Sequence, residues 1–326
     1  MITLVIPTRN RAFTLEKVAP SFFSQPLVSE IILVIDAGTD RTEELVRSIA
    51  SGYPSVALKI VRNPSRSGAA HCRNVGAQAA SNEFVLYCDD DQYLSPGYAA
   101  TCYSKLNAGA DIVCGRMVNL LGNETMEEGI ARFGEGITDS PPFDPRTLDA
   151  VMGARVTGDV VVPVANNAIL TRKSLILRMP FDSYYSARTG WREESDCQMN
   201  AFVHGYKLLM TNDAHTVHLS FADTATGGAR TNAVYALYCV IRNTRYFYRK
   251  YHRGYVAATG SDWSPRRALV IFAARQTHAR LVRPLVVRLR SRAIRQFRRL
   301  PFVRPRPLLN RSHSMGNSPE QHEGAR

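Results

Sequence analysis

Short apolar runs alternate with stretches of helical spacing over the first third of the chain. The apolar runs end in turn-forming residues, as buried strands do. The strands expected from them lie at residues 2–6, 30–35, 56–61 and 84–88. The helices expected between them lie at residues 12–23, 41–51 and 69–80. Strands that alternate with helices through short loops form a parallel sheet covered by helices on both faces, so the pattern predicts an α/β fold.

The pattern is less regular beyond residue 95. Residues 122–149 carry many acidic side chains and no sustained period, which is typical of a mobile lid, a substrate-binding loop or plain disorder. Further helices are expected at residues 96–108, 171–178 and 197–205. Further strands are expected at residues 110–119 and 206–210, with a strand or extended loop at 212–219.

Composition and charge restrict the choice of partners. The chain has 326 residues, 45% of them hydrophobic, which is enough for a substantial core. The formal net charge is +13, but residues 263–319 alone contain fourteen arginines and neither acid nor lysine. The first 262 residues are therefore close to neutral, and any partner that positive charge suggests belongs to the tail.

The cysteines and the apolar runs bear on location. The six cysteines are scattered without CxxC spacing, which favours a reducing compartment over a disulfide framework or a zinc site. The first residues enter directly into a strand with no charged leader, so we expect no secretion signal. The longest apolar run of the tail, residues 268–274, is far below the roughly 18 residues of a membrane span. We expect a cytoplasmic protein, either soluble or peripheral on the inner face of the plasma membrane.

The candidate chemistry begins with three consecutive acids, Asp89, Asp90 and Asp91. They follow the strand expected at residues 84–88 and so lie at a strand's carboxyl end, where open α/β sheets bind ligands. Adjacent carboxylates repel one another unless a cation lies among them, and hard oxygen ligands suit Mn²⁺ or Mg²⁺. The alternative is a solvated acidic turn.

Other loops at the same sheet edge suit a nucleotide. Asp36 ends the second strand, where its carboxylate is placed to accept a hydrogen bond from a base. Gly68 begins a helix, where the backbone approaches a ligand closely and phosphate is attracted, and Arg73 lies one turn further on. Taken singly, these are also ordinary loop and capping features. Neither a dinucleotide-binding glycine motif nor a P-loop is present.

A second acidic cluster contains Trp191, Glu193, Glu194 and Asp196. The tryptophan offers an aromatic face to a sugar, and a neighbouring carboxylate is placed to take a proton from an acceptor hydroxyl. Acids in the first turn of a helix are also ordinary partners of the helix dipole, so a plain helix start is the alternative.

Two histidines follow this cluster, and both are candidate ligands. His215 and His218 are three residues apart, so in a strand they face opposite sides and at most one points into the site. A structural role is the alternative for either of them.

Six motifs, taken in their order along residues 1–220, resemble the inverting family 2 glycosyltransferases. These motifs are Val5-Ile-Pro-Thr-Arg-Asn10, Asp36-Ala-Gly-Thr-Asp-Arg-Thr42, Gly68-Ala-Ala-His-Cys-Arg-Asn-Val-Gly76, Cys88-Asp-Asp-Asp91, Arg192-Glu-Glu-Ser-Asp196 and Val217-His218. The resemblance implies the GT-A fold, with a Rossmann-like mixed central sheet flanked by helices. A basic, helical C-terminal tail is expected to follow it.

The resemblance implies a donor site and a metal site. The residues that it places around the nucleotide sugar are Pro7, Arg9, Asp36, Arg73, Asp89 and Asp90. Among these, Asp36 would face the base, and Arg73 would lie near the diphosphate. The three acids look like the family's DxD motif, in which Asp91 would bind Mn²⁺ or Mg²⁺ and His218 would complete the site.

The resemblance also implies a general base in the pair Glu193-Glu194. The family's commoner pair is Glu-Asp, which makes Glu194 the expected base and leaves Glu193 as an alternative. Trp191 and Asp196 are expected to contact the acceptor. The QxxRW motif of the family's processive members is absent after residue 220, which favours transfer of a single sugar.

The expected function is a metal-dependent, inverting transfer of one sugar from a nucleotide-diphosphate sugar to a hydroxyl acceptor, with lipid-linked molecules and surface-glycan precursors as candidate acceptors. Residues 1–110 would bind the donor and residues 111–262 the acceptor, within one catalytic domain. The alternative enzyme is a sugar nucleotidyltransferase, although that family's Gly-rich, Arg-containing loop after the first strand is missing here. The non-enzymatic alternative is a protein that binds polyanions through its tail.

The tail, residues 263–326, has a character of its own. Arginines recur at helical spacing among apolar residues, which predicts a basic amphipathic helix that binds an anionic membrane surface through residues 264–309. A helix packed on the catalytic domain and an arm that binds nucleic acid are the alternatives, and we do not expect nucleic acid to be the partner. Residues 301–326 are expected to be disordered.

Overall fold

The structure is a computed structural model that describes residues 1–134, 141–151, 154, 158–186, 190–220, 223–224, 232–287 and 289–290. The chain divides into two units, residues 1–281 and residues 282–326. The predictions for residues 291–326, including the part of the predicted membrane-binding stretch from residue 291 to residue 309, lie outside the described residues. Everything that follows on the fold and the site concerns the first unit.

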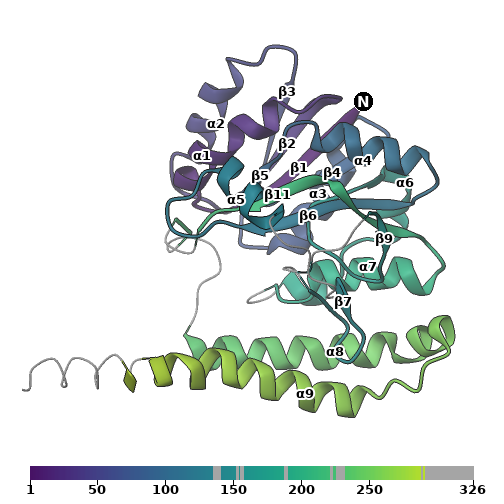
Figure 1. The fold of residues 1–326 in the computed structure, drawn as a ribbon. Helices are drawn as coiled ribbons and strands as arrows, with labels where there is room; N and C mark the ends of the chain where they lie inside the picture. The colour runs from purple at the N-terminus through teal and green to yellow at the C-terminus, as the bar shows by residue number, and fades with distance from the viewer. Residues whose placement is uncertain are drawn as a thin grey trace, which may run out of the picture. The chain divides into compact units, whose positions relative to one another are not determined.

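The four predicted parallel strands form one half of a central sheet (Figure 1). They are β1 (Ile2–Thr8), β2 (Val28–Asp36), β3 (Ala57–Asn63) and β4 (Phe84–Tyr87), paired in the order β3-β2-β1-β4. The helices between them are α1 (Ala12–Phe23), α2 (Thr42–Ala50) and α3 (Ala69–Ala79). This arrangement brings the carboxyl ends of β1, β2 and β4 to one edge, as the sequence pattern predicts.

The other half of the sheet makes it a mixed sheet. After β4 the order continues β10-β6-β11-β5, with β9 pairing β11, and β10 runs antiparallel to both of its neighbours. These strands are β5 (Gln92–Leu94), β6 (Ile112–Asn119), β9 (Val160–Val161), β10 (Ile169–Arg172) and β11 (Leu208–His218). The helices of this half are α4 (Tyr98–Asn107), α6 (Lys173–Arg178) and α7 (Glu193–Val203), with a 3-10 turn, η1 (Ser183–Ser186). The predicted mixed α/β sheet flanked by helices is thus confirmed.

Alternating side chains of the strands supply the two cores of the sheet. Leu4 and Leu33 belong to the core that includes Leu15 of α1, whereas Val5 and Ile32 belong to the core that includes Ala70 of α3. Because strand side chains alternate between faces, apolar residues at successive positions bury both sides of the sheet. This two-sided burial fixes the strand ends that carry the polar residues.

The predicted irregular segment, residues 122–149, contains more order than its composition suggested. Helix α5 (Met126–Gly134) begins with a capping box in which Thr125 and Glu128 exchange side-chain to backbone hydrogen bonds of 2.8 and 3.2 Å. Strands β7 (Phe143–Asp144) and β8 (Asp149–Ala150) form a small separate ladder. The Thr-x-x-Glu spacing was the available signal for the helix.

The C-terminal part of the first unit is a pair of helices that the sequence pattern did not separate from the tail. Helix α8 (Ala233–Thr259) and helix α9 (Pro265–Thr277) lie side by side (Figure 1). Tyr248 of α8, Trp263 of the connection between the helices and Phe272 of α9 are buried, with the Tyr248 and Trp263 rings 5.0 Å apart. The prediction that the tail begins at residue 263 is therefore wrong up to the end of α9. The alternative of a helix packed on the catalytic domain holds for that stretch, because its aromatic side chains complete a core. A π-helical turn, η2 (His278–Val282), follows α9.

Candidate functional site

A cleft of about 670 Å³ lies at the sheet edge where the predicted strands end. The predicted site residues line this cleft, except Asp196 and, of the two candidate histidines, His215. The residues that line it as predicted are Pro7, Arg9, Asp36, Arg73, Asp89, Asp90, Asp91, Trp191, Glu193, Glu194 and His218. The sequence motifs thus converge in space, although they come from elements up to about two hundred residues apart.

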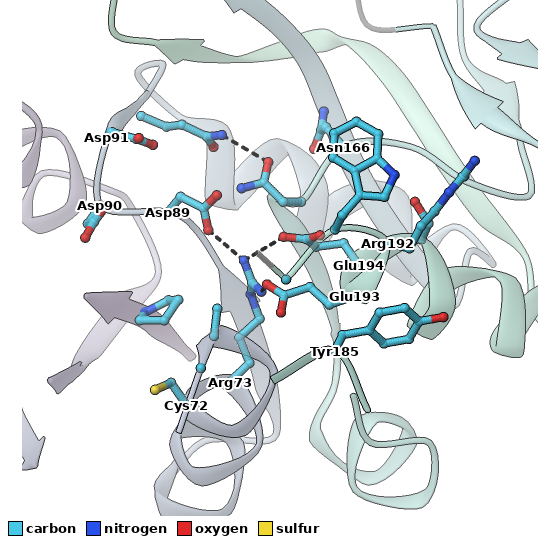
Figure 2. A pocket seen from close by; sticks show the side chains of 18 of the residues that line it. Cys72, Arg73, Asp89, Asp90, Asp91, Asn166, Tyr185, Arg192, Glu193 and Glu194 are labelled. Carbon is cyan, nitrogen blue, oxygen red and sulfur yellow. Dashed lines mark hydrogen bonds and ion pairs between the residues drawn. The ribbon is translucent and has the colours of Figure 1, made fainter. Parts of the chain in front are cut away.

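Arg73 is the centre of the cleft's charge network (Figure 2). Its side chain is 2% exposed, and its guanidinium contacts three carboxylates. Nη2 lies 2.7 Å from Asp89 and 2.9 Å from Glu194, while Nη1 donates to Glu193. One buried cation therefore joins the donor-side acids after β4 to the acids that begin α7, and the three carboxylates hold the guanidinium in its charged form.

Glu193 and Glu194 occupy different environments. The Glu193 side chain is 5% exposed, and its carboxylate accepts from the Ala70 backbone N–H at the start of α3 as well as from Arg73. The Glu194 side chain is 27% exposed and keeps one face toward the cleft. Burial raises the pKa of both carboxyls, and Arg73 opposes that rise. Glu193 is therefore held by hydrogen bonds within the protein, whereas Glu194 is accessible to a ligand in the cleft.

Asp90 and Asp91, the other two acids of the run, have different partners. Asp90 is buried and accepts from the Thr8 hydroxyl at 2.7 Å, and burial together with Asp91 raises the pKa of this carboxyl to about 8. Asp91 lies 3.3 Å from His218 Nε2 through one oxygen and 3.7 Å from Arg11 Nη1 through the other. Burial raises the pKa of Asp91 as well, and His218 opposes the rise.

The pair Asp91 and His218 fits a divalent cation, although the described residues contain no group of three or more His, Cys, Asp and Glu side chains that would cage one. Neighbouring ligands about 2.1 Å from an octahedral ion lie about 3 Å apart. The 3.3 Å between Asp91 Oδ1 and His218 Nε2 is close to that value. An ion held by two protein ligands leaves its other positions to water or substrate oxygens, which is typical of ions that also bind phosphates.

The predicted base-binding residue, Asp36, already has partners. Its carboxylate accepts from the backbone N–H groups of Ser67 and Gly68, at 2.7 and 2.9 Å, and from the Asn63 amide at 3.3 Å. Gly68 has a φ of +83°, and a Cβ there would lie 2.1 Å from the Ser186 carbonyl oxygen. Glycine is thus needed at this position for both its backbone conformation and its close packing. Asp36 holds the start of α3 in place while still facing the cleft.

The two predicted acceptor residues differ. Trp191 lines the cleft, and its indole N–H is buried with no hydrogen-bond partner among the described residues. Asp196 does not line the cleft, and its carboxylate is bound by Lys250 at 2.8 Å and by the hydroxyls of Tyr185 and Tyr251 at 3.0 Å. The prediction that Asp196 contacts the acceptor is therefore corrected, because its side chain is buried and occupied in joining α7 to α8.

Two further cleft residues were missed as site residues. Arg192, at the N-cap of α7, has a φ of +79° and bonds to the carbonyls of Thr147 and Leu148 and to Asp149. Arg11, at the N-cap of α1, lines the cleft beside Asp91. Arg192 begins the motif Arg192-Glu-Glu-Ser-Asp196, but its role had no local signal because all its partners are distant in the chain. Arg11 directly follows the first motif, and that adjacency was the available signal.

Comparison with known proteins identifies the class of protein. Residues 3–153 match the family model described as glycosyl transferase family 2. The uncharacterized glycosyltransferase YwdF of Bacillus subtilis is 35% identical over 98 residues, which cover 30% of this chain and 35% of that protein. The GalNAc(5)-diNAcBac-PP-undecaprenol beta-1,3-glucosyltransferase of Campylobacter jejuni is 30% identical over 128 residues, which cover 39% of this chain and 41% of that protein. In both cases the match spans less than half of the relative's own length.

Solved structures share the fold. S. aureus TarS 1-349 in complex with UDP-GlcNAc has a TM-score of 0.53 at 16% identity, covering 85% of this chain and 72% of that one. GalNAc-T7 with UDP, GalNAc and Mn²⁺ has a TM-score of 0.54 at 16% identity, covering 67% of this chain and 43% of that one. Residues 3–153 thus match glycosyl transferase family 2, and the chain has the GT-A fold of these structures, in agreement with the resemblance seen in its motifs.

Proposed function

We propose that the protein transfers a single sugar, with inversion, from a nucleotide-diphosphate sugar to an acceptor hydroxyl. The observation that carries the proposal is that two different features line one cleft, a candidate cation site and a partly exposed carboxylate. Asp91 and His218 form a pair suited to a cation, and Glu194 keeps a face open to the same cleft. A single displacement needs charge stabilisation on the leaving group and a base on the attacking hydroxyl, and these two groups can supply both.

Glu194 is the proposed general base, and Glu193 is proposed to position Arg73. Burial raises the pKa of Glu194, which improves it as a proton acceptor near neutral pH, while Arg73 keeps it ionised. Glu193 is fixed by Arg73 and by the Ala70 N–H, so it is poorly placed to take a further proton from a substrate. Trp191 is proposed to pack on the acceptor sugar.

The donor side is proposed to use Pro7, Arg9, Asp36, Asp89 and Asp90. The Asp36 carboxylate accepts three hydrogen bonds, from the backbone N–H groups of Ser67 and Gly68 and from the Asn63 amide. A carboxylate has about four acceptor sites, so it can also accept from a base N–H. Asp91 and His218 would hold Mn²⁺ or Mg²⁺. Such a cation supplies Lewis-acid stabilisation of the leaving diphosphate.

A lipid-linked glycan is the proposed acceptor class. The Campylobacter relative is named for a glucosyltransferase acting on a PP-undecaprenol-linked glycan, and this supports an acceptor presented at a membrane. No described helix is long and apolar enough to cross a membrane. We propose that the second unit binds an anionic membrane surface at the cytoplasmic face, because its apolar residues Val282, Leu285 and Leu289 are 42 to 57% exposed and the arginines Arg283 and Arg290 beside them are exposed as well.

Donor turnover is the direct test. Release of nucleoside diphosphate would be measured from UDP-, dTDP- and GDP-sugars with Mn²⁺, Mg²⁺ or chelator, for the wild type and Asp91→Ala. We expect metal-dependent release from one donor class and its loss in the variant. A nucleotidyltransferase would instead need added pyrophosphate, and would convert it and the nucleotide sugar to a nucleoside triphosphate and a sugar 1-phosphate. A purely polyanion-binding protein would bind none of the nucleotides, and either outcome would contradict the proposal.

The assignment of the base has its own test. Glu194→Gln is expected to lower kcat by about 10² or more with little change in thermal stability, because the group is partly exposed. Glu193→Gln is expected to lower both activity and stability, because it weakens the contacts to Arg73 and Ala70. Equal kcat for Glu194→Gln and the wild type would refute the assignment.

A further inference from the structure

Arg11 is a buried cation, and two of its donor groups make no hydrogen bond within the part of the chain that the structure describes. The residue is 9% exposed and lines the cleft. Its Nε and Nη1 groups are buried without a hydrogen-bond partner among the described residues. Buried guanidinium donors are normally hydrogen-bonded, so two unused donors on a side chain that lines the cleft indicate a missing acceptor.

Asp91 does not supply that acceptor. Its nearer oxygen is 3.7 Å from Arg11 Nη1, which is close enough for charge attraction but too far for a hydrogen bond. Asp90, the other neighbouring acid, accepts instead from Thr8. The Arg11 backbone is fixed, because its carbonyl accepts from Thr14 and Leu15 in the first turn of α1. The side chain is therefore held beside the acids without being bound by them.

We propose that Arg11 binds the diphosphate of the donor directly. The guanidinium fork matches the oxygens of phosphate, and the unused donors lie next to Asp91, which is proposed to hold the metal ion. A diphosphate bound by Arg11 would satisfy both donors. The inference rests on the proposed function, and it assigns to Arg11 a role in binding the leaving group.

The position of Arg11 leads us to expect that its removal affects diphosphate affinity and Mn²⁺ affinity differently. A positive charge 3.7 Å from Asp91 repels a cation bound to that carboxylate and attracts a phosphate. Removing the charge should therefore weaken diphosphate binding while leaving Mn²⁺ binding unchanged or making it tighter. If Arg11 only supported the acidic loop, its loss would weaken both ligands together.

The experiment compares Arg11→Gln with the wild type in the full-length protein. Binding of UDP, dTDP and GDP, and of the corresponding monophosphates, would be measured by calorimetry in the presence of chelator. Binding of Mn²⁺ alone would be measured from the spin-resonance signal of the free ion. We expect diphosphate affinity to fall about ten- to a hundredfold, monophosphate affinity to fall less, and Mn²⁺ affinity not to fall.

Two further variants serve as controls. Arg11→Lys keeps the charge but loses the fork, so diphosphate affinity should lie between those of the wild type and Arg11→Gln. Arg172→Gln removes an exposed arginine that pairs with Glu83 at the opposite end of β4, and it should change neither ligand. If Arg11→Gln does not fold, the Lys variant carries the comparison, and wild-type diphosphate affinity in it would contradict the proposal.

The outcomes separate this inference from the proposed function. A wild type that binds no nucleoside diphosphate, with or without Mn²⁺, overturns the proposed function and the role of Arg11 with it. A wild type that binds diphosphate and an Arg11→Gln variant that binds it equally well overturn the role of Arg11 alone. A parallel loss of diphosphate, monophosphate and Mn²⁺ binding makes Arg11 a structural support instead.

Discussion

Arg192 Nη2 lies 2.6 Å from Asp149 Oδ1, and this ion pair joins the residue before the proposed catalytic pair to strand β8. The Arg192 side chain is 2% exposed and packs against the ring of Phe247 in α8, 4.8 Å from its centroid, and against that of Phe272 in α9. The start of α7 is thus held by residues from three distant parts of the chain. Glu194 owes its position partly to these contacts.

Arg192→Lys should lower kcat without a comparable change in KM for the donor. Lysine keeps the charge, but its single ammonium group cannot reach all three acceptors at once, namely the carbonyls of Thr147 and Leu148 and the carboxylate of Asp149. The start of α7 would therefore lose its fixed orientation. Arg192→Ala should also destabilise the fold by about 3 kcal/mol, because it removes buried hydrogen bonds and leaves a cavity. Steady-state kinetics and urea unfolding measure the two effects. Wild-type kcat in the Lys variant would show that Arg192 does not position Glu194.

Lys250→Met should destabilise the protein by about 3 kcal/mol. Lys250 pairs with both Asp182 and Asp196, at 2.7 and 2.8 Å, and the Asp196 side chain is 2% exposed. Its removal leaves the buried Asp196 carboxylate without a counter-charge, and burial already raises the pKa of that group. Urea unfolding of Lys250→Met, Asp196→Asn and the double variant forms a mutant cycle. We expect the double variant to be more stable than Lys250→Met. If the folded Asp196→Asn variant showed a strongly raised acceptor KM, the corrected role of Asp196 would be wrong.

Truncation should separate the packed helix from the tail beyond it. A chain ending at Asp262 loses Trp263 and Phe272 from the core of α8 and α9, and each such loss costs about 3–5 kcal/mol, so we expect it not to fold. A chain ending at Leu281 keeps the first unit and should melt at nearly the full-length temperature. Circular dichroism checks both. Binding to anionic vesicles should be lost in the chain ending at Leu281, and equal vesicle binding by that chain and the full-length protein would contradict the membrane proposal.

Asp90→Asn should stabilise the protein at neutral pH. Burial and Asp91 raise the pKa of Asp90 from 3.8 to about 8, so the folded state holds a proton that the unfolded state releases. Stability then falls as pH rises from about 4 to about 8, since the unfolded state binds fewer protons there. Asparagine still accepts from Thr8 but does not ionise, so this loss of stability disappears in the variant. Its free energy of unfolding should exceed that of the wild type by about 2 kcal/mol at pH 8 and equal it near pH 3. Urea unfolding across pH without metal measures the difference, and a constant offset between the two proteins would contradict the prediction.

The sequence determined the parallel half of the sheet and most of the site. Period-two and period-3.6 patterns fix which residues enter strands and helices, and parallel topology then carries Asp36 and the run Asp89 to Asp91 to one edge. The family motifs added Arg73, Glu193 and Glu194. These residues line one cleft because they stand at element ends or, like Arg73, about one turn inside one, and the position of an element end follows from local pattern.

The tertiary structure decided what each polar group does. Whether an acid beside a helix start faces the cleft or pairs with a lysine depends on α8, which lies some forty residues further along the chain, so Asp196 could not be told from Glu194 by local pattern. The same holds for Arg192, whose partners come from the segment before β8 and from α8, and for Trp263, which local composition assigned to the tail. Burial and charge pairing arise from contacts between distant segments, and a single sequence records only the residues, not which of them meet.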